Sequence, residues 1–257
     1  MKNDISHLTA EHFNEWLSTL FGYQLRCREA KLDTSLSRTR NILKAHQIGM
    51  SYYFAGEALE DAVLSGDNQI FLAETPEMAD VYRTYVCLIA KRFLGVTLTG
   101  SPIVLSNGAQ IHFLSLGDQT FAGKAGHVYV DEYFWIPDFG KTLHLVCAMA
   151  MHKRWRKTYC STLSERRGMA RKFWGGMYWK SLYPGRETII FPGEPSLRDG
   201  GQLCPDQQWR YVITIEDAVR LGCNLMDIDE LKDEYPQEVF NFLFMCQFKD
   251  SQESVLS

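Results

Sequence analysis

The sequence has no apolar run approaching the 18 or more residues that a membrane-spanning helix requires. Its first residues, MKNDISHLTAEHF, also lack the apolar core of a signal peptide. These two absences exclude a membrane span and argue against export. We therefore expect a cytoplasmic protein with no membrane partner.

The seven cysteines include no CxxC pair and are scattered along the chain. An odd, dispersed set does not suit a disulfide framework or a zinc ribbon, and it fits reduced thiols in a cytoplasm. We expect each cysteine to act as a small buried hydrophobic residue.

The chain also lacks a strong excess of positive charge, since its formal net charge is -4. A basic coat that could alone bind nucleic acid is thereby excluded, although a local basic face is not. Residues 152–172 hold eight bases and one acid, whereas residues 216–238 hold eight acids and two bases. This segregation indicates either a polar working surface or two ordinary solvated faces.

Apolar periodicity and turn residues predict strands that alternate with helices, which is typical of parallel βαβ units. Asn107-Gly108 between two apolar runs predicts a hairpin and hence a mixed sheet. Expected helices are Ala10–Phe21, Ser51–Ser65, Pro76–Leu94 with Thr75 as N-cap, Leu143–Met151, Arg171–Tyr183, Thr214–Gly222 and Asp227–Phe248, the last two after a Gly/Pro-rich loop at 192–210. Expected strands are Asn41–Lys44, Gln69–Ala73, Ile103–Leu105, Ala109–Leu114, His127–Asp131, Lys157–Ser161 and Thr188–Phe191.

A strand leads into a helix through Lys44–Ser51, and such a turn directs backbone N–H groups and a helix N-terminus at one point. The usual phosphate loop reads GxxxxGK[ST]. Here Gly49 and Ser51 occupy their expected positions, while Met50 replaces the lysine and Lys44 replaces the first glycine. The loop is either an ordinary strand-to-helix turn or a phosphate site whose lysine has moved to Lys44.

Adjacent carboxylates, Asp131 and Glu132, end the strand that starts at His127. In nucleotide hydrolases this arrangement places an Asp beside Mg²⁺ and a Glu beside the attacking water. A purely structural strand end is the alternative.

Two further polar positions fit the same chemistry. Ser161 and Thr162 end another strand, where a hydroxyl could sense the γ-phosphate or merely terminate the strand. Gln24 lies upstream of the loop, and a glutamine amide can both donate to and accept from adenine. A solvent-facing glutamine is the plainer interpretation.

These signals occur in an order that resembles the ATPase part of the large subunit of tailed-phage terminase, the motor that packages DNA into a capsid. The resemblance covers roughly residues 20–250. The segments that carry it are Asn41–Leu59, Gly126–Pro137 (GHVYVDEYFWIP), Met149–Thr162 (MAMHKRWRKTYCST) and Trp209–Phe248, with ITIEDAVRLGCNL and LFMCQF.

The resemblance implies a P-loop ATPase of the ASCE type, a mostly parallel sheet between helices with a small helical C-terminal subdomain, using ATP and Mg²⁺. Lys44, Gln47, Gly49 and Ser51 correspond to the Walker A loop, and Gln24 to the adenine-reading glutamine. Asp131 and Glu132 correspond to the Walker B aspartate, which with Ser51 would hold Mg²⁺, and to the catalytic glutamate. Ser161 and Thr162 correspond to the coupling motif.

Three residues depart from the family pattern. His46 stands where the family commonly has arginine, Met50 is bulkier than expected, and Leu163 follows Thr162 in place of proline. The length departs as well, because family members usually continue into a nuclease domain. We therefore expect an ATPase core at 1–191, a helical subdomain at 192–257, and no nuclease activity from this chain.

The implied partners are double-stranded DNA, the terminase small subunit, the portal or capsid vertex, and further copies in a homo-oligomeric ring in the bacterial host cytoplasm. Arg154 and Arg156 are candidate DNA contacts, and with Arg166 and Arg167 they are candidate arginine fingers. Two alternatives stay open: a non-catalytic nucleotide- or protein-binding prophage remnant, and a helicase-like cellular ATPase, which the absence of a second motor domain disfavours.

Overall fold

The computed structural model describes residues 3–117, 121, 123–166 and 168–248. Within them, one eight-stranded sheet has the order β3-β4-β2-β5-β6-β1-β8-β7. The pairs within β4-β2-β5-β6-β1-β8 are all parallel, and the outer pairs β3–β4 and β7–β8 are antiparallel. The strands are β1 (Thr39–Lys44), β2 (Gln69–Ala73), β3 (Ile103–Val104), β4 (Gln110–Ser115), β5 (His127–Asp131), β6 (Lys157–Ser161), β7 (Gln202–Leu203) and β8 (Trp209–Ile213).

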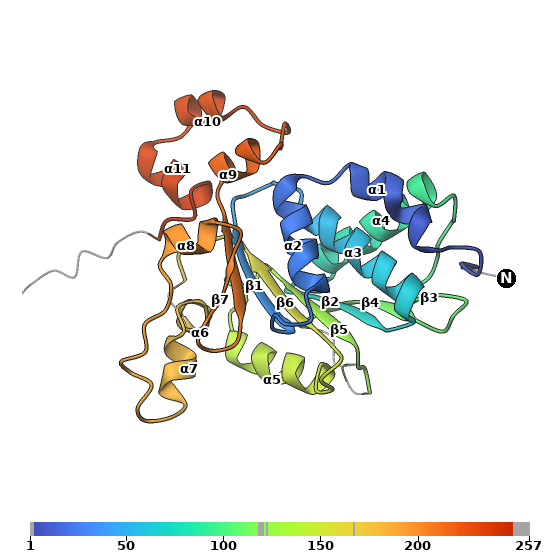
Figure 1. Ribbon diagram of the computed structural model, residues 1–257, viewed down its shortest axis with the longest axis horizontal. Coiled ribbons are helices and arrows are strands. Elements are labelled where there is room, and N and C mark those ends of the chain that lie inside the picture. Colours follow the sequence, from blue (N-terminus) through green and yellow to red (C-terminus); the bar gives the residue numbers. More distant parts are fainter. Residues whose placement is uncertain (1–2, 118–120, 122, 167, 249–257) are drawn as a thin grey trace, which may run out of the picture.

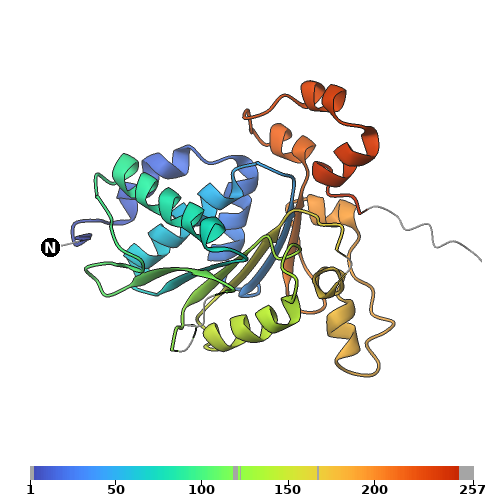
Figure 2. The ribbon, with the colours of Figure 1, turned by 180° about the vertical axis from the view of Figure 1, so that it is seen from behind.

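Helices cover both faces of this sheet, so the predicted α/β sandwich is confirmed. Figures 1 and 2 show α1 to α4 on one face and α5 on the other, while α9 to α11 form a lobe beyond the sheet. A short 3₁₀ helix covers Ala10–Phe13. The α-helices are α1 (Asn14–Ser18), α2 (Gly22–Leu32), α3 (Met50–Ser65), α4 (Pro76–Phe93), α5 (Phe139–Met149), α6 (Met169–Trp174), α7 (Met177–Ser181), α8 (Glu194–Arg198), α9 (Ile215–Arg220), α10 (Ile228–Glu234) and α11 (Gln237–Leu243).

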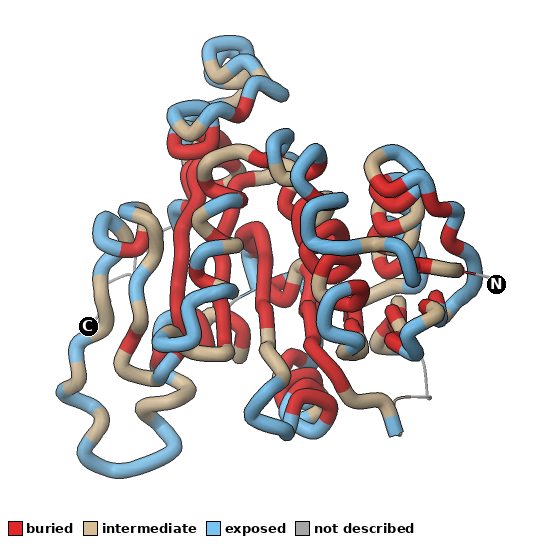
Figure 3. The backbone as a smooth tube through the Cα atoms, turned by 45° about the vertical axis from the view of Figure 1, so that its right-hand side comes forward, coloured by how far each residue is buried: buried red, intermediate tan, exposed pale blue. Residues whose placement is uncertain are grey.

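The central strands are buried (Figure 3). Each face of the sheet has its own apolar cluster. In β2, Phe71 belongs to the cluster under α3 and α4, whereas Ile70 and Leu72 belong to the cluster under α5. This alternation follows the period of two of a strand. At Gly56 of α3 an added Cβ would lie 2.2 Å from the Trp16 ring, so a glycine is required where α1 crosses α3.

Several expected elements are confirmed, including the strands at 41–44, 69–73, 127–131 and 157–161 and the N-cap at Thr75. The expected strand Thr188–Phe191 is wrong, because that segment forms neither helix nor strand. Instead β8, which lies partly inside the expected loop, pairs with β1. The sheet thus crosses residue 191, and the division into two domains stays a prediction.

Expected long helices are shorter where glycine or proline intervenes. The segment 171–183 divides into α6 and α7 at Gly175-Gly176. Gly176 has a left-handed backbone with φ +77°, and a Cβ at this position would lie 2.2 Å from the Phe191 ring. The segment 227–248 divides at Pro236, which lacks an amide proton for a continuous helix. Helix α2, which the sequence pattern did not predict, is an additional element.

The sheet order brings the carboxyl ends of β1, β5 and β6 together. In the register, Asp131 of β5 is opposite Cys160, and Ser161 is opposite Leu43 of β1. Lys44, Asp131 and Ser161 therefore emerge at one edge of the sheet, which is where open α/β folds bind ligands. No helix of the described residues is long and apolar enough to cross a bilayer.

Candidate nucleotide-binding site

The turn between β1 and α3 has the backbone of an anion-binding loop. Gly49, the N-cap of α3, is left-handed with φ +74°, and Gln47 is also left-handed with φ +57°. The sixteen-residue helix α3 begins directly after Gly49, so its unpaired N–H groups and its positive dipole end face the loop. This local geometry suits a phosphate without any side chain.

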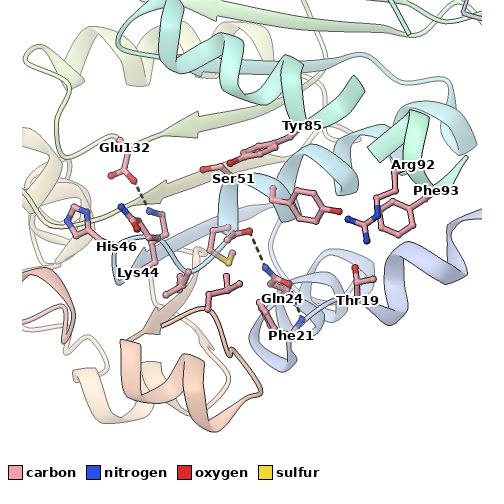
Figure 4. A pocket seen from close by; sticks show the side chains of 16 residues that line it. Thr19, Phe21, Gln24, Lys44, His46, Ser51, Tyr85, Arg92, Phe93 and Glu132 are labelled. Carbon is pink, nitrogen blue, oxygen red and sulfur yellow. Dashed lines mark hydrogen bonds and ion pairs between the residues drawn. The ribbon is translucent and has the colours of Figure 1, made fainter. Parts of the chain in front are cut away.

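A cavity of about 740 Å³ opens above the loop (Figure 4). Its wall is formed by the loop, by the ends of β1 and β5, and by α2 and α4. The residues predicted to bind ATP all line it, namely Gln24, Lys44, Gln47, Gly49 and Ser51, and Glu132 lines it as well.

Lys44 and Glu132 face each other across this cavity, with Lys44 Nζ 2.7 Å from Glu132 Oε1. Burial disfavours the lysine charge, but the Glu132 carboxylate outweighs burial and raises the pKa of Lys44 above its ordinary value. Lys44 therefore carries a full positive charge beside the loop, which supports the interpretation of a displaced phosphate-loop lysine.

The second oxygen of Glu132 is bound by the end of β6. Glu132 Oε2 accepts hydrogen bonds from the Thr162 amide at 2.8 Å, the Thr162 hydroxyl at 2.7 Å and the Ser161 hydroxyl at 3.2 Å. Burial favours protonation, yet Lys44 and these donors hold the pKa of Glu132 below its usual value. The carboxylate is thus ionised and directly joined to both residues of the expected coupling motif.

Asp131 is different, because its carboxylate is incompletely satisfied. Its side chain is buried, and Oδ1 has no hydrogen-bond partner. Burial and the adjacent Glu132 charge raise the pKa of Asp131 to about 7. A cation would supply the missing partner and favour the ionised form. The Asp131 carboxylate therefore fits a divalent cation, and the Ser51 hydroxyl stays a predicted second ligand.

Gln24 joins α2 to the loop. Its amide nitrogen donates to the Gly49 carbonyl at 3.1 Å, and its amide oxygen accepts from the Phe21 amide at 3.0 Å. A glutamine amide has two donors and two acceptor sites, so one of each remains. That remaining pair matches the predicted contact with adenine.

The expected DNA contacts lie away from this edge. Arg154 and Arg156 precede β6, at the amino ends of the strands, and they pair with Asp67 and Asp61 at 2.7 Å each. The Arg156 side chain is 22% exposed, and the Arg154 side chain is 65% exposed. Arg156 is therefore committed to the fold, and only Arg154 offers a largely accessible charge.

Two further residues, Arg166 and Arg167, are candidate arginine fingers. Arg166 donates to the Trp135 carbonyl, and Trp135 Nε1 donates to the Thr162 hydroxyl at 3.0 Å. Arg166 is thus linked to the coupling motif through the segment after Glu132. Arg167 lies outside the described residues.

Sequence reasoning missed the contribution of α4. Arg92 and Phe93, at its end, line the cavity opposite Lys44 (Figure 4), and Tyr85 lines it as well. The sequence predicts only a helix for this segment, because apolar periodicity does not show which of its residues face a ligand.

Comparison with known proteins agrees with the resemblance. The chain is 47% identical over 258 residues to the "Probable terminase, ATPase subunit" of Haemophilus phage HP1 and 42% identical over 237 residues to the "Terminase, ATPase subunit" of Escherichia phage P2. These alignments cover 100% and 91% of this chain but only 42% and 40% of the relatives. The chain thus spans less than half the length of either relative.

The fold also matches a solved structure. The large terminase ATPase domain of Thermus phage P74-26 superposes with a TM-score of 0.63 at 14% identity, covering 94% of this chain and 98% of that one. Residues 41–257 match the family described as terminase large subunit, T4likevirus-type, N-terminal. The chain therefore belongs to the family of phage terminase large subunits and represents its N-terminal part.

Proposed function

We propose that this chain is the ATP-hydrolysing module of a DNA-packaging motor. The observation that carries the proposal is the cluster at the carboxyl edge of the sheet. There the Lys44–Glu132 pair and the incompletely satisfied Asp131 lie beside a loop built for an anion. The names of the relatives from phages HP1 and P2 support the same activity.

The residues divide the work by position. Backbone N–H groups around Gly49 and the ammonium of Lys44 bind the β- and γ-phosphates. Ser51 and Asp131 would hold Mg²⁺, and the ion would supply positive charge beside the phosphates. Lys44 turns from Glu132 to the nucleotide, and this frees one carboxylate oxygen to accept a proton from the attacking water.

The coupling step follows from the hydrogen bonds of Glu132. Ser161 and Thr162 bind the same carboxylate oxygen, so a change at Glu132 reaches the end of β6 without an intermediary. From Thr162 the contact continues to Trp135 and Arg166. This segment is our candidate for transmitting γ-phosphate loss.

The proposal has further parts. The module translocates double-stranded DNA, assembles into a ring, and docks on the small subunit and on the portal or capsid vertex. Arg154, which is exposed, is the candidate phosphate contact. Phosphate contacts carry no base information, which suits a motor that must move any sequence.

Steady-state ATP hydrolysis, measured with and without double-stranded DNA, tests the proposal. We expect Mg²⁺-dependent hydrolysis that Glu132→Gln reduces at least about a hundredfold. Nucleotide binding without hydrolysis in the unaltered chain would favour a non-catalytic remnant. The observation that favours this second candidate is the departure of His46 and Met50 from the family pattern of the loop.

A further inference from the structure

The turn that follows β5 holds Glu132 in an unusual backbone conformation. Glu132 is left-handed with φ +45°, which is uncommon for a residue other than glycine. The Trp135 amide closes the turn by donating to the Glu132 carbonyl at 2.8 Å. The Phe134 amide ties the turn to the end of β6 by donating to the Ser161 hydroxyl at 3.1 Å. Strained residues of this kind persist only where their surroundings determine the backbone, and they concentrate at functional sites.

The side chain of Trp135 makes a further bond to the end of β6. Its indole Nε1 donates to the Thr162 hydroxyl at 3.0 Å, and its carbonyl accepts from Arg166. Trp135 is 38% exposed, so water can satisfy its N–H and burial does not require Thr162 as the partner. The consequence of this bond therefore lies in what it does to Thr162.

The indole N–H decides the direction in which the Thr162 hydroxyl donates. An indole nitrogen can only donate, so the Thr162 oxygen accepts from it. The single proton of that hydroxyl is then directed to Glu132 Oε2, 2.7 Å away. The Ser161 hydroxyl is not fixed in this way, because the Thr162 carbonyl at 2.8 Å lies closer to it than Glu132 Oε2 at 3.2 Å. Of the two hydroxyls beside Glu132, that of Thr162 is thus the one whose donation is fixed.

The two carboxylate oxygens of Glu132 thereby differ. Oε2 is held by the Thr162 amide and hydroxyl, whereas Oε1 faces Lys44 in the cavity (Figure 4). We propose that Trp135 is a positioning residue for Glu132, because its indole N–H fixes the Thr162 hydroxyl as a donor to Oε2 and so keeps Oε1 directed at the nucleotide. This inference rests on the proposed function, in which Glu132 accepts a proton from the attacking water. A residue that orients a reacting carboxylate needs no contact of its own with the substrate.

The test removes the indole N–H and leaves the reacting groups in place. Trp135→Phe is the variant, and Trp179→Phe is the matched control. Trp179 is a half-buried indole on α7, with the guanidinium carbon of Arg186 4.0 Å from its ring centroid. We expect kcat for ATP to fall roughly three- to tenfold in Trp135→Phe, the worth of one hydrogen bond, with ADP affinity unchanged. Trp179→Phe should change neither quantity.

A second readout follows the protonation of Glu132 in the protein without nucleotide. The Thr162 amide donates to Glu132 Oε2 at 2.8 Å, so its chemical shift in an NMR titration reports the ionisation of that carboxylate. Loss of a fixed donor destabilises the ionised form, so the midpoint should move to higher pH in Trp135→Phe, by up to about one unit. The acid limb of the kcat profile should move in the same direction. The variant leaves unchanged the other titratable side chains around Glu132, namely Lys44, His46, Asp131 and Cys160.

A double variant isolates the hydroxyl through which Trp135 acts. In a Thr162→Val background, Trp135→Phe should no longer move the midpoint of the amide titration, because the hydroxyl that the indole fixes is absent. If Trp135→Phe does not fold, benzothienylalanine at position 135 takes its place, since it keeps the ring shape and lacks only the N–H.

The outcomes separate this inference from the proposed function. A fall in kcat with neither midpoint displaced would overturn the positioning role and leave Trp135 a merely structural one. Midpoints and kcat equal to those of the unaltered chain would overturn it as well. An unaltered chain that hydrolyses no ATP would refute the proposed function, while the amide titration would still decide whether Trp135 orients Glu132.

Discussion

The two ends of α3 use charged and polar residues in opposite ways. Its first turn, at Ser51, faces the carboxyl edge of the sheet, where Asp131 Oδ1 has no hydrogen-bond partner. Farther along, Glu57 pairs with Arg40 at 2.5 Å and also accepts from Tyr53 and Tyr129. The comparison teaches that the complete ionic network stabilises the fold, whereas the incomplete one is available for chemistry.

The last turns of α3 add further ion pairs, although Arg156 Nε is buried without a hydrogen-bond partner. Asp61 binds Lys31 at 3.0 Å and Arg156 at 2.7 Å, and it lies 3.3 Å from His127 Nε2. Burial opposes ionisation, but these cations hold the pKa of Asp61 below its ordinary value. These ion pairs, and a hydrogen bond from Gln69 to Asp61, join α3 to α2 and to the amino ends of β2, β5 and β6, away from the cavity.

The largest expected effect is on stability, from Glu57→Gln. This change leaves the buried Arg40 without a counter-charge, so we expect a loss of about 3–5 kcal/mol in the free energy of unfolding. Denaturant titration measures it. Glu29→Gln, in an exposed pair with Arg26, is the control and should cost less than about 1 kcal/mol. Equal effects would break the contrast between buried and exposed pairs.

At the carboxyl edge of the sheet, Glu132→Gln should reduce ATP hydrolysis at least about a hundredfold, because a positioned proton acceptor is lost. This reduction corresponds to an increase of roughly 2.7 kcal/mol in the activation free energy. Mg-ATP binding should persist. Steady-state turnover and equilibrium binding are the measurements, with the exposed Glu77→Gln as control. Undiminished turnover would remove Glu132 from the mechanism.

Lys44→Ala should weaken nucleotide binding by roughly 1.5–3 kcal/mol, the worth of a charge-assisted contact. Isothermal titration with ADP measures it, and the exposed Lys141→Ala should change nothing. Unaltered affinity in Lys44→Ala would mean that another group supplies the charge, with His46 the first candidate. Met50→Lys should be tolerated if the loop keeps its usual shape.

A smaller effect should appear in the pH dependence of ADP binding without Mg²⁺. Burial and Lys44 lower the pKa of His46, so it is neutral near pH 7 in the free protein. Bound phosphate should raise that pKa, so binding takes up a proton and affinity falls as pH rises through the raised value. The change is at most about tenfold per pH unit. His46→Gln should flatten the profile, and an unchanged profile would contradict this assignment.

The smallest effect concerns DNA. Arg154 is exposed, whereas Arg156 is tied to Asp61, so Arg154→Ala should lower the salt slope of duplex binding by about one and Arg156→Ala should leave it unchanged. A monomer should bind weakly at physiological salt, and useful affinity should appear only when several copies add their contacts. Anisotropy titrations with size measured alongside test this. Tight binding by a proven monomer would reject the ring argument.

Much of the fold could be predicted from the sequence because its central strands are short apolar runs bounded by clear turns. Strand β8 was not predicted, since Trp209–Ile213 follows a Gly/Pro-rich segment and includes Arg210, whose charge is paired with Asp206. Arg210 also donates to the carbonyls of Phe173 and Trp174, and only the tertiary structure supplies these two partners. Likewise, the loop and carboxylates were visible as motifs, but Arg92 and Phe93 were not, because their place in the cavity wall depends on how α4 packs.

Amide hydrogen exchange with and without a non-hydrolysable Mg-ATP analogue tests the central contrast between the two ends of α3 most directly. The account predicts slowed exchange at residues 45–52, 132–134 and 161–162, with no change at residues 57–65 or 152–157. Slowed exchange confined to residues 57–65 and 152–157, or no slowing at saturating analogue, would contradict it.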